Sequence, residues 1–332
     1  MATAPARPGE FELIARHFAP IAGPGGLGLI DDAGLLRPGR GFEIVVTTDA
    51  LVAGVHFLAD DPPGSIARKA LAVNLSDLAA KGARPDGFVL SLALAPGWDE
   101  AWLAAFAAGL AAIAAEAGCP LIGGDTVSTP GPLTLSITAF GSVPAGRMVL
   151  RSGAKYGDVL LVSGTIGDGA LGLKVHAPDA PAWVAGLDQA ARDELADRYL
   201  HPRPRLALAQ ALQAHASAAM DVSDGLVGDL AKLVTASGVG AEVDLDAVPF
   251  SAAVRSAVMA DPALAELAWT GGDDYEILCT VPDEKYSSLI AAADAAGVPL
   301  VRIGRIAGVP GTVLYREAGR PREFARGSFV HF

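Results

Sequence analysis

Residues 220–230 read MDVSDGLVGDL and pass from an apolar, strand-like run into an apolar helix. The turn between them holds two carboxylates three residues apart, Asp221 and Asp224, with the Ser223 hydroxyl between them and a glycine next. This pattern fits a metal and phosphate site, because carboxylate and hydroxyl oxygens suit a hard cation and glycine permits close approach. It equally fits a helix N-cap, in which Ser223 or Asp224 binds free backbone N–H groups. The stretch alone leaves both interpretations open.

Other aspartates occupy the same kind of position, at the ends of apolar, strand-like runs beside Gly, Ser or Thr. The strings LIDDAGLL, IVVTTDAL, VNLSDLAAKG, LIGGDTVS and WTGGDDYEIL hold Asp31, Asp32, Asp49, Asp77, Asp125, Asp273 and Asp274. Carboxylates in buried-looking segments are costly unless a cation or hydrogen bonds compensate. Oxygen ligands without a Cys/His cluster suit Mg²⁺, which usually completes its coordination with water and substrate phosphates. The pattern therefore predicts an enzyme that acts on a Mg²⁺–polyphosphate.

A loose internal echo links the two halves of the chain. The strings NLSD, ending at Asp77, and DVSD, ending at Asp224, are each followed by a Gly-Gly-Asp. Asp125 follows Asp77 by 48 residues, and Asp273 follows Asp224 by 49 residues. Coincidence and duplication both remain open, but either way we expect each half to supply carboxylates to the site.

The composition bounds the class of protein. The 332 residues leave room for two domains, and a hydrophobic content of 51% indicates sizeable cores. The formal charge of −12 and the lack of any Lys/Arg run argue against a nucleic-acid surface. The N-terminus lacks an apolar signal core, and the stretch 101–115 is shorter than the roughly 20 residues of a membrane span. Cys119 and Cys279 are expected to be small buried hydrophobes. We therefore expect a cytoplasmic protein without a membrane or nucleic-acid partner.

Strand and helix signals alternate along the chain, which predicts an α/β (α+β) fold. Strands are expected at 42–48, 87–94, 120–122, 133–140, 158–163, 241–245, 275–281 and 300–306. Helices are expected at 65–80, 99–117, 188–199, 204–215 and up to residue 237 after the DVSDG turn. The Gly- and Arg-containing segment 143–157 breaks this pattern, so we place a boundary there. The predicted domains are residues 1–147 and 148–332.

Two familiar phosphate-binding motifs do not apply. Residues 23–28 formally match G-x-G-x-x-G, but they follow a helix, whereas the dinucleotide motif follows a strand. The P-loop sequence G-x-x-x-x-G-K-[ST] does not occur. Arg151 and Lys155 are the best candidates for phosphate clamps, although solvated loop cations would look the same. His56 could contact an anion, but a lone histidine is more often structural.

In their order, these motifs resemble the thiamine-monophosphate kinase family, in the superfamily that includes aminoimidazole ribonucleotide synthetase and selenophosphate synthetase. The resemblance covers nearly the whole chain, through GEFELIARHF, the DD pair, TTDALVAGVHF, KALAVNLSDLAAKGA, LIGGDT, RSGAK-x-GD, DVSDGL, GGDDYE and the terminal HF. It implies a mixed-sheet domain, residues 1–147, that binds metal and ATP and forms a homodimer through its sheet. It also implies an α/β sandwich domain, residues 148–332, that completes the active site, and ATP-dependent conversion of thiamine monophosphate to thiamine diphosphate with several Mg²⁺ ions.

The resemblance further implies roles for individual residues. The metal ligands would be Asp32, Thr47, Thr48, Asp49, Asp77, Asp125, Asp221 and Asp224. The ATP contacts would be Gly124, Asp125, Arg151 and Ser223. The substrate contacts would be His56 and Asp273, with Phe329 as the aromatic contact near the C-terminus. The chain departs from the family where Ile30 replaces a usual Gly, where Asp273 replaces a usual Glu, and where GSFVHF carries an extra residue.

The expected chemistry needs no general base, and none is assigned. A phosphate monoester acceptor is largely ionised near pH 7, since its second pKa is about 6. We expect direct in-line transfer through positioning and charge neutralisation. The alternatives are another ATP-dependent enzyme of the superfamily and a non-catalytic nucleotide-binding homologue. A selenophosphate synthetase would carry Cys and Lys in the Gly-rich loop at 23–41, and a hydrogenase-maturation dehydratase a C-terminal Cys; this chain has neither.

Overall fold

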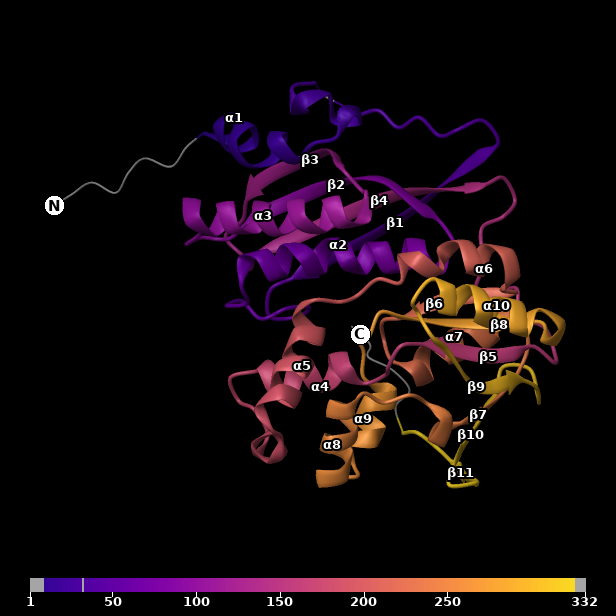
Figure 1. The fold of residues 1–332 in the computed structure, drawn as a ribbon. Helices are drawn as coiled ribbons and strands as arrows, with labels where there is room; N and C mark the ends of the chain where they lie inside the picture. The colour runs from indigo at the N-terminus through magenta and orange to yellow at the C-terminus, as the bar shows by residue number, and fades with distance from the viewer. Residues whose placement is uncertain (1–8, 32, 326–332) are drawn as a thin grey trace. The chain divides into compact units, whose positions relative to one another are not determined.

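The computed structural model describes residues 9–31 and 33–325 and divides into two compact units. Unit 1 comprises the chain up to Asn74 together with Pro85–Ser142, and unit 2 comprises Leu75–Arg84 and the chain from Val143 onward. Each unit combines a sheet with helices, which confirms the predicted α/β (α+β) class (Figure 1).

Unit 1 is built on a four-stranded sheet in the order β1-β4-β2-β3. Its strands are β1 (Phe42–Val52), β2 (Arg84–Leu94), β3 (Leu121–Ser128) and β4 (Thr134–Pro144), and β2 pairs with β3 in parallel. Figure 1 shows α2 (Pro63–Ala80) and α3 (Glu100–Ala117) along one side of this sheet. Short helical segments precede the sheet: α1 (Glu10–Leu13), η1 (Ile14–Phe18), η2 (Ala19–Ile21) and η3 (Pro24–Leu29).

Helix α3 is the one described helix that is long and apolar enough to cross a membrane by length and composition. Its buried residues recur at helical spacing: Leu103, Phe106, Ala107, Leu110, Ile113 and Ala114. This spacing is that of a helix with one face against a core. The helix begins as predicted, because the Asp99 carboxylate accepts the Trp102 N–H at 2.7 Å, and it ends at Gly118 in the left-handed conformation.

Unit 2 is built on a seven-stranded sheet in the order β11-β10-β7-β9-β5-β8-β6. The strands are β5 (Val159–Ser163), β6 (Ala218–Val222), β7 (Ala241–Asp244), β8 (Glu276–Val281), β9 (Leu300–Ile306), β10 (Val313–Glu317) and β11 (Arg320–Arg322). The helices are α4 (Asp168–His176), α5 (Gln189–Leu200), α6 (Ala209–His215), α7 (Leu226–Ser237), α8 (Ala252–Ala260), α9 (Leu264–Thr270) and α10 (Asp283–Ala295). Because β8 runs antiparallel to both β5 and β6, the ends of β5 and β6 lie beside the start of β8.

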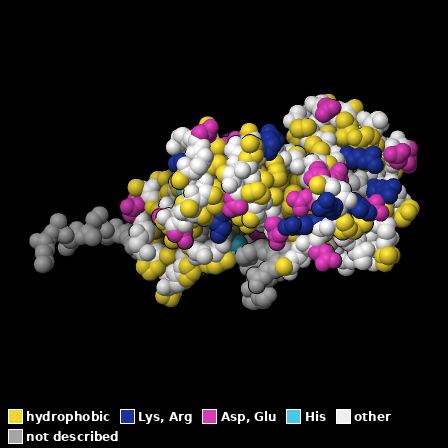
Figure 2. Space-filling view, turned by 90° about the horizontal axis from the view of Figure 1, so that it is seen from below, with side chains coloured by type: hydrophobic (Ala, Val, Ile, Leu, Met, Phe, Trp, Pro, Cys, Tyr) yellow, Lys and Arg dark blue, Asp and Glu magenta, His cyan; other side chains and the backbone are white. Residues whose placement is uncertain are grey.

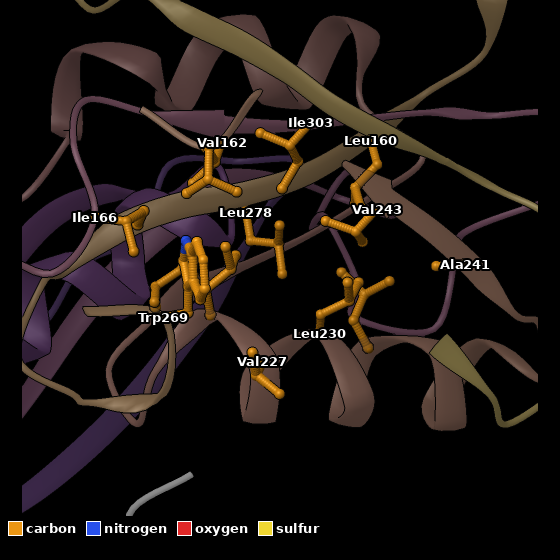
Figure 3. Packing of buried hydrophobic residues seen from close by; sticks show 14 of the residues in the cluster. Leu160, Val162, Ile166, Val227, Leu230, Ala241, Val243, Trp269, Leu278 and Ile303 are labelled. Atoms are coloured by element: carbon orange, nitrogen blue, oxygen red, sulfur yellow. The ribbon is translucent and has the colours of Figure 1, made fainter. Parts of the chain in front are cut away.

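Two cores cover the faces of this sheet. On one face, side chains of α7 and α9 pack on β5, β7 and β8; in Figure 3, Leu230 of α7 lies toward Val243, and Trp269 lies near Leu278. On the other face, α6 and α10 pack on the alternate residues of β5 and β8. Both cysteines are buried and free, which confirms the sequence prediction, and burial raises the pKa of each thiol to about 12.

Two predicted elements end differently in the structure. The strand expected at 120–122 continues to Ser128, so Gly123, Gly124 and Asp125 lie within β3. The pairing of β2 with β3 explains the extension, since Gly124 and Asp125 are in register with Leu90 and Ser91. In the same way β1 runs past Thr48 to Val52, which places Asp49 inside a strand.

Candidate functional site

In unit 1, Asp31 and Asp125 line the same cavity of about 370 Å³. Asp125 projects from β3 and is exposed, and Asp31 comes from the loop that follows η3. The cavity also has an apolar part, with Phe11, Ile14 and Phe18 among its lining residues. An apolar wall beside two carboxylates is typical of a site that holds a small polar ligand through a few placed groups.

The glycine before Asp125 is required by the packing of β3 on β2. A Cβ atom added at Gly124 would lie 2.2 Å from the Leu90 carbonyl oxygen, which is far inside van der Waals contact. A Cβ atom added at Gly123 would meet nothing closer than 3.5 Å. Gly124 therefore sets how closely β3 approaches β2, and with it the place from which Asp125 projects.

The predicted residues of β1 lie along one strand, where neighbours on β4 hold them. The Thr48 hydroxyl donates to the Ile137 carbonyl at 3.2 Å and accepts from the Thr138 hydroxyl at 3.0 Å. The Asp49 carbonyl accepts from the Ser136 hydroxyl at 3.0 Å. Thr47 precedes Thr48 directly in the sequence and is half-buried. Three oxygen-bearing side chains thus follow one another on an ordered strand.

His56 lies in the turn after β1. Its Nδ1 accepts the Val52 N–H at 3.0 Å. A neutral ring with Nδ1 as acceptor carries its proton on Nε2, which makes that nitrogen a donor. The geometry therefore suits contact with an anionic oxygen.

In unit 2, Asp77 of α2 and Asp221 of β6 are carboxylates close enough for the charge of Asp77 to act on Asp221. Burial, followed by the charge of Asp77, raises the pKa of Asp221 from 3.8 to about 8. A hydrogen bond from Ser76 and the charge of Lys81 act in the opposite direction. The Lys81 ammonium is itself held by the Ala219 carbonyl at 2.8 Å. A buried carboxylate whose ionisation a neighbouring carboxylate opposes fits the predicted cation site.

Arg151 belongs to the same surroundings. Burial lowers the pKa of Lys81, and the charge of Arg151 lowers it further. The Arg151 carbonyl accepts from the Ser237 hydroxyl at 3.0 Å, which fixes the backbone from which the exposed guanidinium extends. An exposed guanidinium near a carboxylate pair fits the predicted phosphate contact.

The DVSD turn is held by a residue that the sequence analysis did not select. The buried Asp229 carboxylate accepts the N–H groups of Ser223 and Asp224 at 3.0 and 2.9 Å. Neither Ser223 nor Asp224 is the N-cap of α7, because that position is Gly225 and no side chain caps it. The N-cap interpretation is therefore wrong. The signal available in the sequence was a carboxylate in the first turn of the helix that follows the motif.

Asp224 also has a cation beside it. The Lys232 ammonium pairs with Asp224 and with Asp229, the latter at 2.8 Å. Lys232 lies two turns along α7 and was not selected from the sequence either. Its charge compensates Asp224 within the protein, in contrast to Asp221.

The Asp273–Asp274 pair lies in a strained loop before β8. Asp273 has φ 72° and Tyr275 has φ 52°, both in the left-handed region, where a residue with a Cβ costs roughly 1–2 kcal/mol. The Asp273 N–H donates to the Ser223 carbonyl at 2.9 Å, and the Tyr275 hydroxyl donates to the Asp273 carboxylate at 3.2 Å. Asp273 is therefore tied to the DVSD turn through the backbone.

The predicted residues are divided between the two units, and within unit 1 those of β1 and those of β3 lie on opposite edge strands of the sheet. Unit 1 holds Thr47, Thr48, Asp49, His56, Gly124 and Asp125, and unit 2 holds Asp77, Arg151, Asp221, Ser223, Asp224 and Asp273. Within the described ranges, no three His, Cys, Asp or Glu side chains converge closely enough to hold a metal ion. Asp32 and Phe329 lie outside the described residues. The metal, ATP and substrate assignments stay predictions.

Two family models together match most of the chain. The model for the AIR synthase related protein N-terminal domain matches residues 30–143, and that for its C-terminal domain matches residues 155–317. The thiamine-monophosphate kinase of Caulobacter vibrioides is 44% identical, over 99% of this chain and 93% of that protein.

Solved structures agree with these matches. The crystal structure of thiamine-monophosphate kinase from Stenotrophomonas maltophilia aligns with a TM-score of 0.79 at 41% identity, over 89% of this chain and 91% of that one. A structure described as "AaThiL complexed with AMPPCP and TMP" aligns with a TM-score of 0.75 at 28% identity, over 93% of this chain and 97% of that one.

The close approach of β3 to β2 yields a stability prediction with a matched control. Gly124→Ala should lower the free energy of unfolding by about 2 kcal/mol or more, because backbone or neighbouring strand must move to admit the Cβ atom. Gly123→Ala, in the same strand, should change it by no more than about 0.5 kcal/mol. Thermal or denaturant unfolding of both variants decides the matter, and equal effects would contradict the packing argument.

The Asp77–Asp221 pair yields a prediction about pH. The folded pKa of Asp221, about 8, lies above the ordinary 3.8, so the folded state loses stability as pH rises between these values. Asp221→Asn removes this loss. In metal-free buffer the variant should match the wild type near pH 4 and melt increasingly higher up to about pH 8, by at most about 1.4 kcal/mol per pH unit. Melting curves in a chelator test this; a difference independent of pH would refute it.

Proposed function

The chain belongs to the thiamine-monophosphate kinase family, within the AIR synthase related proteins, and on this premise we propose that it transfers the γ-phosphoryl group of ATP to thiamine monophosphate. The product would be thiamine diphosphate. The observation in the structure that supports this most directly is the Asp77–Asp221 pair, in which burial and the charge of Asp77 raise the pKa of Asp221, as expected of a carboxylate at a cation site. The kinases named above align with 99% and 89% of the chain, which extends the support to both units.

The oxygen donors in both units fit Mg²⁺. Thr47, Thr48, Asp49 and Asp125 in unit 1, and Asp77, Asp221 and Asp224 in unit 2, offer hydroxyl and carboxylate oxygens without a soft ligand. We assign the metal to these residues, with Asp32 added from the family resemblance. When bound, Mg²⁺ ions neutralise charge on the ATP phosphates and orient them. Asp224 would have to exchange the Lys232 ammonium for the metal.

The residues of the chain then bind and orient the two substrates. Gly124 and Asp125 on β3, with Arg151 and Ser223 in unit 2, are assigned to ATP. The Nε2 donor of His56 is assigned to the phosphate of thiamine monophosphate, and the Asp273 carboxylate to its cationic thiamine part. No residue is assigned as a base, since the acceptor phosphate is already ionised. The reaction is direct in-line transfer by positioning and charge neutralisation.

A homodimer in the cytoplasm, formed through the sheet of the N-terminal domain, completes the proposal. We take the N-terminal domain as residues 1–147 and the C-terminal domain, which completes the active site, as residues 148–332. In the four-stranded sheet, β1 is an edge strand. Its residues Phe42, Ile44 and Val46 alternate along the strand, and their exposed fractions are 45%, 42% and 56%. An apolar stripe on an edge strand is unfavourable in water unless a second surface covers it. On the face drawn in Figure 2, Lys and Arg side chains are interspersed with Asp and Glu side chains.

The reaction is tested by incubating the full chain with ATP, Mg²⁺ and a panel of phosphomonoesters. Thiamine diphosphate should form from thiamine monophosphate, with inversion at a chiral transferred phosphorus. Asp125→Asn should stay folded, lose activity by about tenfold or more, and need more Mg²⁺, since a charged ligand is lost. Turnover of another acceptor would favour a different enzyme of the superfamily, and ATP binding without turnover would favour a non-catalytic homologue. Retention at phosphorus would overturn direct transfer.

The substrate role of Asp273 makes a second prediction. Asn tolerates the left-handed conformation, so Asp273→Asn should fold normally and lose only the charge. It should raise the KM for thiamine monophosphate about tenfold and leave that for ATP unchanged. Asp273→Glu keeps the charge and should retain a KM near the wild-type value. Steady-state kinetics distinguish this from a turn role, for which Asn would be neutral and Glu harmful.

The proposed dimer is tested by placing a charge in the exposed stripe of β1. Val46→Glu should yield monomers in sedimentation experiments, because burying an unpaired carboxylate in an interface is costly. Val309→Glu is the matched control, since Val309 is also exposed, at 66%, but lies in unit 2 between β9 and β10. A wild-type chain that sediments as a monomer, or a Val46→Glu variant that stays dimeric, would refute the assigned interface.

A further inference from the structure

The loop before β8 holds an unfavourable conformation that something must maintain. Asp273 and Tyr275 both lie in the left-handed region, and Asp274 stands between them. Asp tolerates this region, whereas a bulky residue such as Tyr is a clear outlier there. Such conformations persist only where the surroundings over-determine them, and they gather at functional sites.

The Asp274 side chain supplies the first restraint. It is 1% exposed, and its two oxygens accept the N–H groups of Gly167 at 2.8 Å and Gly169 at 3.0 Å. The two backbones are in close contact, since a Cβ atom added at Gly169 would lie 2.2 Å from the Asp273 carbonyl oxygen. Asp274 therefore fastens its own loop to the turn that opens α4, without reaching solvent.

A buried arginine supplies the second restraint. Arg198 of α5, 4% exposed, donates to the Glu276 carboxylate at 2.9 Å and approaches the Asp274 carbonyl at 3.5 Å. Glu276 also accepts from the Ser163 hydroxyl at 2.6 Å and from Arg205 Nε at 2.7 Å. Glu276, the first residue of β8, is thus held in place directly after the strained loop.

The third restraint joins the loop to the DVSD turn. The N–H groups of Asp273 and Tyr275 donate to the carbonyls of Ser223 and Val222, at 2.9 and 2.8 Å. The Tyr275 hydroxyl then donates to the Asp273 carboxylate at 3.2 Å. The Asp273 carboxylate is therefore held at a defined place relative to Ser223, which is assigned to ATP.

We propose that Asp274 and Tyr275 are positioning residues for the thiamine monophosphate: Asp274 fixes the backbone of Asp273, and the Tyr275 hydroxyl fixes its carboxylate. This inference rests on the proposed function through the substrate role of Asp273. Asp274 acts without touching either substrate, because its carboxylate is buried and both its oxygens are occupied by backbone N–H groups. These restraints set the affinity for thiamine monophosphate and leave the affinity for ATP unchanged.

Asp274→Asn is the principal test. The amide nitrogen faces a backbone N–H where an oxygen was an acceptor, so one of the two hydrogen bonds is lost. The KM for thiamine monophosphate should rise about tenfold, with the KM for ATP within twofold of wild type. Tyr275→Phe keeps the ring and removes only the hydroxyl; it should raise the same KM about threefold. Ser251→Ala is the control, because Ser251 caps α8 in the same unit, so its loss lowers stability and should change neither KM.

A double-mutant cycle decides whether the effect passes through Asp273. In an Asp273→Ala background, neither Asp274→Asn nor Tyr275→Phe should raise the KM for thiamine monophosphate further. Equal rises in both KM values, or full additivity with Asp273→Ala, would overturn the proposal. If Asp274→Asn does not fold, a Tyr275→Phe variant with wild-type kinetics overturns it instead. A wild-type chain that makes no thiamine diphosphate refutes the proposed function, whereas active wild type with unselective variants refutes this inference alone.

Discussion

The site in unit 2 depends on the close backbone packing of three loops. One loop follows β5, one follows β6 and one precedes β8. The pairing of these three strands brings the loops to one end of the sheet. A Cβ atom at Gly169 or Gly272 would overlap a carbonyl oxygen of a neighbouring loop, 2.2 and 2.3 Å away. Since the loops meet without intervening side chains, a shift in one moves the others. The places of Asp221, Ser223 and Asp273 are therefore set jointly.

The carboxylates at this end of the sheet are compensated in two different ways. Asp224 and Asp229 share the Lys232 ammonium, and Asp229 also accepts two backbone N–H groups, which together offset part of the burial that raises the pKa of Asp229. Asp221 has no such partner set, and its pKa is raised because burial and Asp77 oppose its ionisation. A protein without need of a cation there would be more stable with a neutral residue. The cost in stability is what makes the Asp77–Asp221 pair informative about function.

The sequence predicted the fold class and most elements, because strand and helix periods are local properties; β9 at 300–306 and α3 after Asp99 appear as expected. The sequence did not predict the roles of Asp229 and Lys232, because the folded path of the DVSD turn decides which groups these side chains contact. The echo between NLSD and DVSD shows the same limit. Asp77 lies within helix α2 and Asp224 in a turn, while Asp125 lies in a strand and Asp273 in a left-handed loop. The nearly equal spacings of 48 and 49 residues therefore do not correspond to a shared conformation.

The unequal compensation also orders the proposed metal ligands of unit 2. A cation at Asp221 relieves repulsion that the protein bears in its absence, so part of its binding free energy comes from removing that cost. A cation at Asp224 must displace the Lys232 ammonium, which then has Asp229 as its remaining partner. A cation at Asp221 adds an attraction to the site, whereas a cation at Asp224 only replaces the attraction to the Lys232 ammonium. The Asp77–Asp221 position should therefore bind Mg²⁺ more tightly than Asp224. In the proposed site, the Asp77–Asp221 position would therefore hold its cation before the nucleotide binds, whereas the Asp224 position would take a metal that the nucleotide brings.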